Sequence, residues 1–258
     1  MKRFFISALF LWISTHQAVS AADRCIVIQE FGSRSFAYHE GDFSFRTSPC
    51  STFKIALSLM GYDAGILINE FWPEWPYDEL KEMTVVSWKR AQTPKTWIQN
   101  SCIWYSQALT ARLGADLFQH YVASFRYGNQ DISGDFGKNN GLSHCWLSSS
   151  LAISPQEQIE FLEQLLKQRL PCSLAAHGMT QHLLRIEEME NGWQLYGKAG
   201  SGWHNERSVG WFVGWAVKDE RTVLFACRIL DSLERDRPAG GIAKDEMIFF
   251  LKTYLRIR

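Results

Sequence analysis

The stretch PCSTFKIAL, residues 49–57, decides how the rest of this chain is interpreted. Apolar residues flank Ser51 and Lys54, which predicts the start of a buried helix. Residues three apart lie on one face of a helix, so we expect the two side chains to meet. Ser51 needs an adjacent base to become a nucleophile, and Lys54 can serve only if burial removes its proton. Taken alone, this pattern is more often an ordinary helix N-cap followed by a solvated lysine.

The composition excludes several classes of function. The chain has 258 residues, of which 46% are hydrophobic, and this is enough for a large core in one or two domains. Lysine plus arginine and aspartate plus glutamate both number 27, so no basic field favours a nucleic-acid partner. No repeat or run of like charge indicates a repeat array or an interaction tail.

The N-terminus is typical of a secretory signal peptide. Lys2 and Arg3 form a charged start, and residues 4–13 are mostly apolar. Small residues at 19–21 predict cleavage after Ala21 or Ala22, with residues 1–21 as the signal peptide. Nothing later resembles a transmembrane helix, so we expect a soluble mature protein with no membrane partner, exported to a bacterial periplasm.

The cysteines leave two interpretations open. In an oxidising compartment they could form disulfides, whereas small buried apolar side chains are an equally good explanation. No cysteine or histidine spacing indicates a zinc site. The six residues are Cys25, Cys50, Cys102, Cys145, Cys172 and Cys227.

Secondary structure in the first two thirds of the chain follows from apolar periodicity and turn residues. Residues 24–30 and 35–38 are predicted to form a β-hairpin, and a helix is predicted over 51–61. Prolines make residues 66–77 a loop. A mostly helical middle is expected from about 94 to about 182.

Within that middle, residues 95–113 show apolar residues at helical spacing, and 116–125 form a second predicted helix. Glycines and polar residues make 128–141 a loop. The stretch SPQE at 154–157 predicts another helix start, with an N-cap, a proline and a glutamate in capping-box spacing.

Strands return near the C-terminus, at residues 193–198, 208–217 and 222–230, and a closing helix is predicted over 242–255. Strands at both ends and helices between them predict an α+β fold, an antiparallel sheet flanked by helices with an inserted all-helical region. The predicted domains are a sheet domain of residues 22–62 and 183–258 and a helical domain of 63–182, with the site in the cleft between them.

Four other stretches are candidates to meet the Ser51–Lys54 pair. They are SCIWY at 101–105, YGN at 127–129, Trp146, and KAGSGW at 198–203. A second serine could relay a proton, an indole N–H could hold a buried anion, and a lysine beside glycines could bind a flat anionic substrate. Each also has a plainer explanation, as a helix cap, a turn, a core side chain or a strand end.

Together the motifs resemble the class D serine β-lactamases, the oxacillinase type. The resemblance covers nearly the whole mature chain and implies the penicillin-recognising serine enzyme fold, shared with DD-peptidases. It rests on PCSTFKI at 49–55, SCIWYSQ at 101–107, YGN at 127–129, Trp146, SPQEQ at 154–158 and KAG at 198–200.

The resemblance implies a nucleophile and its base. Ser51 would open the β-lactam ring and become acylated, while Lys54 would be N-carboxylated by carbon dioxide, which reacts only with a neutral amine. Carboxylated Lys54 would be the base for acylation and for deacylation. Trp146 would donate to the carboxylate, and Ile103 and Phe53 would keep it dry. No metal and no cofactor besides carbon dioxide or bicarbonate is implied.

The same resemblance implies the other site residues. Ser101 and Lys198 would form a proton relay, and the backbone N–H groups of Ser51 and Ser201 would form the oxyanion hole. Substrate would contact Lys198, Ala199, Gly200 and Ser201.

Three positions depart from the family pattern. Ala199 stands where threonine is usual, Ile103 where valine is usual, and Ala239 where many members have an arginine that grips the substrate carboxylate. Ser201 is a candidate to replace the threonine hydroxyl, and Arg237 is a candidate to replace the arginine.

We therefore expect an exported serine β-lactamase, monomeric or homodimeric, that hydrolyses penicillin-type β-lactams and confers resistance to them. One alternative is a penicillin-sensing receptor domain, which is acylated without efficient turnover. The other is a penicillin-binding peptidase, which needs no pocket for a carboxylated lysine.

Overall fold

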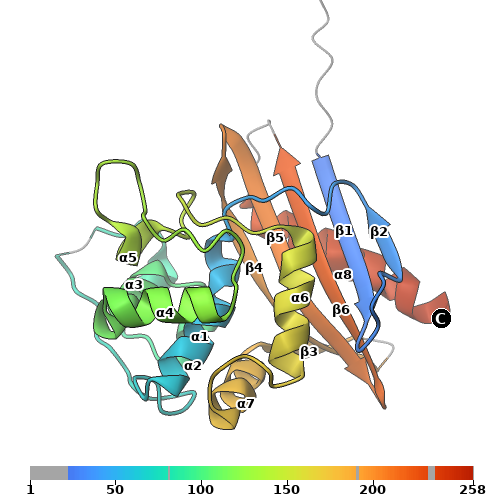
Figure 1. Ribbon diagram of the computed structural model, residues 1–258, viewed down its shortest axis with the longest axis horizontal. Coiled ribbons are helices and arrows are strands. Elements are labelled where there is room, and N and C mark those ends of the chain that lie inside the picture. The colour runs from blue at the N-terminus through green and yellow to red at the C-terminus, as the bar shows by residue number, and fades with distance from the viewer. Residues whose placement is uncertain (1–22, 81, 190–191, 232–235, 258) are drawn as a thin grey trace, which may run out of the picture.

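Figure 1 shows a computed structural model of the chain, which describes residues 23–80, 82–189, 192–231 and 236–257. The predicted signal peptide at 1–21 lies outside the described residues. Within the described ranges, no helix has both the length and the apolar character needed to cross a bilayer.

A six-stranded antiparallel sheet carries both ends of the chain. The N-terminal strand pairs with a strand formed near the C-terminus, as expected for a sheet built from the two termini. In spatial order the strands are β2 (Tyr38–Glu40), β1 (Asp23–Glu30), β6 (Arg221–Asp231), β5 (Arg207–Lys218), β4 (Gln194–His204) and β3 (Arg185–Glu188). The predicted mixed α and β fold is confirmed.

Both faces of the sheet are buried. In Figure 1, α8 (Ala239–Ile257) covers one face and α6 (Pro155–Leu166) crosses the other. Successive side chains of a strand point to opposite faces, so Trp211 and Val213 of β5 join the core shared with the helical middle. Phe212, between them, joins the core beneath α8.

The helical middle is built around α1, of which residues 54–62 are all buried. A 3-10 turn, η1 (Cys50–Phe53), leads directly into this helix. A second turn, η2, spans Val86–Trp88. The helices of this region are α1 (Lys54–Asp63), α2 (Pro94–Asn100), α3 (Ile103–Leu113), α4 (Ala115–Ser124), α5 (Gly141–His144), α6 and α7 (Leu174–Leu183).

Some predicted elements are wrong in detail. The helix expected over 95–113 is two helices, because Ser101 adopts a left-handed φ of 55° that ends α2. The second hairpin strand begins at Tyr38 instead of residue 35. Strand β3 was not predicted, since three of its four residues are charged. The α8 helix extends beyond the predicted 242–255.

The six cysteines are free thiols. Five of them are buried, and Cys172 is half-buried. Burial raises the pKa of Cys50 and of Cys25 to about 12, so both thiols stay protonated at neutral pH. The structure therefore supports the small apolar interpretation and pairs none of the six residues.

Candidate active site

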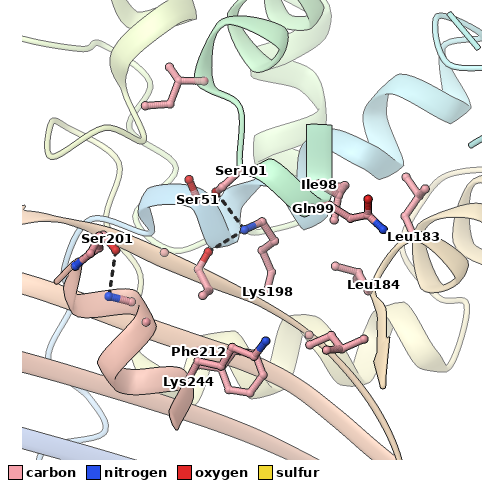
Figure 2. Close-up of a pocket in the computed structure, with 18 of the residues that line it drawn as sticks. Ser51, Ile98, Gln99, Ser101, Leu183, Leu184, Lys198, Ser201, Phe212 and Lys244 are labelled. Atoms are coloured by element: carbon pink, nitrogen blue, oxygen red, sulfur yellow. Dashed lines mark hydrogen bonds between the residues drawn. The ribbon is translucent and has the colours of Figure 1, made fainter. Parts of the chain in front are cut away.

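A cavity of about 610 Å³ lies where η1, α2, β4 and the start of α8 meet. Ser51, Ser101 and Lys198 all line this cavity, and Figure 2 shows them around one space. Its other polar side chains include Gln99, Arg185, Ser201 and Lys244.

The structure brings Ser51 and Lys54 together at the floor of the cavity. Lys54 Nζ donates to Ser51 Oγ over 3.2 Å. Ser51 is 8% exposed, whereas Lys54 is fully buried among the apolar side chains of α1. This burial lowers the pKa of Lys54 to about 7, because an ammonium loses its hydration there. A neutral amine is therefore available beside the hydroxyl at neutral pH, which is what a serine nucleophile requires.

Ser101 and Lys198 form a second pair on the other side of the cavity. The left-handed backbone conformation of Ser101 ends α2, and α3 begins two residues later. Lys198 Nζ donates to Ser101 Oγ over 3.0 Å and to the carbonyl oxygen of Ala199 over 2.9 Å (Figure 2). Burial lowers the pKa of Lys198 well below its ordinary value, and the charges of Lys54 and Lys244 lower it further. A lysine held in this way can pass a proton to the hydroxyl it contacts.

One edge of β4 faces away from β5 and supplies backbone N–H groups. The N–H of Gly197 leaves this edge and reaches the Leu184 carbonyl over 2.9 Å. The N–H of Trp203 also leaves it and reaches Ser148 Oγ over 2.8 Å. Backbone groups alternate in direction along a strand. The N–H of Ser201, which lies between these two at the same parity, therefore points from this edge as well.

The β4 edge lies directly against the turn that carries Ser51. A Cβ atom built on Gly200 would come within 3.0 Å of the Ser51 backbone nitrogen and 3.1 Å of the Thr52 nitrogen. Only glycine leaves room for this approach. The β4 edge that carries Gly200 and Ser201 therefore lies against the backbone of Ser51.

Trp146 lies in the core behind Ser51. It is fully buried and stacks on Phe53, with 5.7 Å between ring centroids. Its Nε1–H has no hydrogen-bond partner among the described residues. A buried donor without an acceptor costs about 1–3 kcal/mol, so this indole is poised for an acceptor that the chain itself does not provide. Tyr127, of the YGN stretch, packs on the same Phe53 ring at 5.1 Å and belongs to this core.

Ser201 and Arg237, the candidates to replace the usual threonine hydroxyl and the usual arginine, both contact other residues of the chain. Ser201 Oγ accepts a hydrogen bond from the Gly240 N–H over 2.9 Å, so it holds the start of α8 (Figure 2). Arg237 forms an ion pair with Asp245 at 2.6 Å and lines a separate pocket. Ala239 is buried against the sheet. Ile103 lines the cavity.

Lys244 lines the cavity and was missed by the sequence reasoning. No local pattern in the sequence indicates it, and its place follows from the packing of α8. Gly240 and Gly241 line the cavity too, and residue 244 lies one helical turn beyond them on the same face of α8.

Known proteins are similar to this chain in both sequence and structure. The penicillin binding protein transpeptidase domain family matches residues 20–249. β-Lactamase OXA-9 of Klebsiella pneumoniae is 39% identical over 99% of this chain and 99% of its own length. A crystal structure of the class D β-lactamase OXA-427 has a TM-score of 0.85 and 40% identity, covering 90% of this chain and 98% of that one. The chain belongs to the class D β-lactamases.

Other relatives of this class D β-lactamase differ in their described roles. β-Lactamase OXA-1 of Escherichia coli is 37% identical over 84% of this chain and 78% of its own length. The regulatory protein BlaR1 of Bacillus licheniformis is 30% identical over 81% of this chain but only 33% of its own length. Among the described residues of this class D β-lactamase, no three histidine, cysteine or acidic side chains gather as a metal site.

Proposed function

We propose that this class D β-lactamase hydrolyses penicillin-type antibiotics through an acyl-enzyme on Ser51. The observation that carries the proposal is the contact of Lys54 Nζ with Ser51 Oγ at 3.2 Å, in a site where the lysine is fully buried. A base of lowered pKa beside a serine hydroxyl is the arrangement that makes serine a nucleophile.

We further propose that Lys54 works as an N-carboxylated side chain, formed with carbon dioxide. Two observations support this: its pKa of about 7 supplies the neutral amine, and the Trp146 indole lacks an acceptor. The carboxyl group would supply an anionic base in place of a cation. Phe53, which is buried, and Ile103, which lines the cavity, would keep water away from the modified side chain.

In the acylation step, Ser51 Oγ gives its proton to the Lys54 side chain and forms a bond to the lactam carbonyl carbon. The N–H groups of Ser51 and Ser201 bind the oxygen, on which negative charge develops. The C–N bond of the ring then breaks. The ring nitrogen takes a proton from Ser101, which takes one from Lys198 across their 3.0 Å contact.

Before deacylation, the Lys54 side chain releases the proton that it took from Ser51, and Lys198 regains the proton that it gave to the relay, so both groups are reset by exchange with solvent. In the deacylation step, the Lys54 side chain takes a proton from water, and the water oxygen attacks the ester carbonyl carbon. The bond from that carbon to Ser51 Oγ breaks, and Ser51 takes the proton back from Lys54. One water is consumed for each ring opened, and the protein returns to its starting state.

The similarity to the regulatory protein BlaR1 favours one alternative, a β-lactam sensor that is acylated but does not turn over. Steady-state hydrolysis of benzylpenicillin, combined with intact-protein mass, separates the two functions. We expect many turnovers per protein, and loss of both turnover and acylation in Ser51→Ala. Ser58→Ala is the matched control, because Ser58 lies on the same buried helix but contacts Thr180 at 2.9 Å. One equivalent of stable adduct without turnover would establish the sensor and refute the hydrolase.

We also propose that residues 1–21 direct export to the periplasm, where hydrolysis confers β-lactam resistance on the producing cell. The mature protein, monomeric or homodimeric, would hold its site between a sheet domain (22–62 and 183–258) and a helical domain (63–182). N-terminal sequencing of the periplasmic protein checks the cleavage after Ala21 or Ala22, and a full-length cytoplasmic protein would contradict it.

A further inference from the structure

We propose that Lys244 binds the carboxylate of the substrate and thereby makes this enzyme selective for anionic β-lactams. The inference rests on the proposed function, because it names a residue that recognises the same substrate. Nothing in the family pattern assigned a role to this position, which lies one helical turn beyond the glycines at the start of α8.

The Lys244 side chain is well placed to meet a ligand in the cavity. It is half-buried and lines the cavity that contains Ser51, Ser101 and Lys198. Lys198 lines the same cavity, and the charge of Lys244 is one cause of its lowered pKa. In the view of Figure 2, Lys198 lies between Ser101 and Lys244. Lys244 forms no ion pair or hydrogen bond with any described residue, so its charge remains available to a ligand.

The other cations in and near the cavity are less free to hold a carboxylate. Lys198 Nζ already donates to Ser101 Oγ and to the carbonyl oxygen of Ala199, so two of its three N–H donors are committed. Arg185 is exposed and donates to Gln194 over 2.9 Å. Arg237 is paired with Asp245 and lies in the neighbouring pocket.

The electrostatic field of the α8 helix also favours an anion near Lys244. This helix begins at the cavity, where Pro238, Gly240 and Gly241 line the wall, and its first turn contains no acidic side chain. The N-terminal end of a helix carries a partial positive charge. An anion beside Lys244 is therefore favoured by the ammonium and by the helix end together.

The test compares benzylpenicillin with its methyl ester, which differs by the missing carboxylate charge. For the wild type we expect a preference for the acid in kcat/KM. In Lys244→Met we expect kcat/KM for the acid to fall about 10- to 100-fold, mainly through KM, and the ester to be hydrolysed as before. Lys244→Arg should keep most of the preference. Arg237→Met and Lys252→Met, the latter two turns further along α8, should leave it unchanged.

Several outcomes would overturn the inference. An equal loss for acid and ester in Lys244→Met would mean a structural role, and no loss for either would mean no role in recognition. Loss of the preference in Arg237→Met would assign the carboxylate to Arg237.

Failure of the proposed hydrolysis would be recognised separately, by absence of wild-type turnover. In that case benzylpenicillin binding to Ser51→Ala, with and without Lys244→Met, measures the same contact by calorimetry. A 10-fold weaker binding of the acid in the double variant supports Lys244, and equal binding refutes it.

Discussion

Lys54 and Lys198 are buried in the same site, and the positive charge of Lys54 is one cause of the lowered pKa of Lys198. Two ammonium groups in such surroundings repel one another, and burial penalises both. The site therefore favours a state in which Lys54 has lost its charge. An anionic Lys54 side chain would reverse the repulsion and help Lys198 to hold the proton that the leaving group needs.

The cost of burying Lys54 is expected to appear in the pH dependence of stability. Its pKa is about 7 in the folded protein and 10.5 ordinarily, so the unfolded chain binds more protons between these values. The wild-type unfolding free energy gains a positive slope with pH there, up to about 1.4 kcal/mol per pH unit from this group. Lys54→Met removes this slope. The amount by which the variant's unfolding free energy exceeds that of the wild type should therefore be largest near pH 7 and shrink toward pH 9. Urea unfolding of both proteins in bicarbonate-depleted buffer measures this difference in unfolding free energy. A difference that stays constant between pH 7 and pH 9 would show that burial does not lower the pKa of Lys54.

Gly200→Ala tests the close approach of β4 to the nucleophile. The new Cβ would lie 3.0 Å from the Ser51 nitrogen and force the two backbone segments apart. We expect kcat for benzylpenicillin to fall by about 100-fold or more, as when an oxyanion-hole donor is lost. Gly178→Ala is the control, since no atom lies within 4 Å of its built Cβ and it sits in helix α7. The control should gain up to about 1 kcal/mol of stability with unchanged kcat. Normal turnover in Gly200→Ala would refute this geometry.

Trp146→Phe removes the unpartnered indole N–H but keeps an aromatic ring against Phe53. If the N–H holds a carboxylated Lys54, the variant should need about tenfold more bicarbonate for half-maximal turnover, the loss of roughly one hydrogen bond to a charged group. Trp97→Phe is matched to it, because the Trp97 indole already donates to Ser106 over 2.9 Å. That control should lose stability without a change in bicarbonate dependence. The same bicarbonate requirement in Trp146→Phe and the wild type would show that the indole has another purpose.

Ser101→Gly removes the hydroxyl and keeps the left-handed backbone conformation. Glycine adopts the φ of 55° without strain, so thermal unfolding should be unchanged. Turnover should fall by about 10²- to 10⁴-fold, because the relay from Lys198 to the leaving nitrogen is broken. Ser101→Ala should lose the same activity and some stability as well. If Ser101→Gly retains wild-type kcat, Lys198 must deliver the proton by another route.

The sequence was sufficient for the parts of the site that depend on local spacing. Ser51 in η1 and Lys54 at the start of α1 are three residues apart, a spacing that brings the two side chains together on one face. The capping box at Ser154 and Glu157 forms as its spacing predicts. The strands β5 and β6 were recognised because both faces are apolar.

The remaining features depend on tertiary contacts that no local pattern encodes. The left-handed conformation of Ser101 interrupts a stretch whose apolar periodicity is continuous, so the sequence predicts one helix there. Its position in the sequence makes Arg237 a candidate, but its ion pair with Asp245 holds it at the neighbouring pocket. Lys244 shares the cavity because α8 packs over the sheet at a particular angle, and spacing alone cannot give that angle.

The most direct test of the account is the carboxylation of Lys54. Purified mature protein is freed of carbon dioxide, assayed with benzylpenicillin, then supplied with ¹³C-labelled bicarbonate and examined by ¹³C NMR. We predict low turnover that recovers with bicarbonate, together with one carbamate resonance that is absent from Lys54→Ala and lost as the pH falls below about 7, where the amine is protonated. Full turnover without bicarbonate, and no carbamate resonance at any pH, would contradict the central claim and leave the free amine of Lys54 as the base.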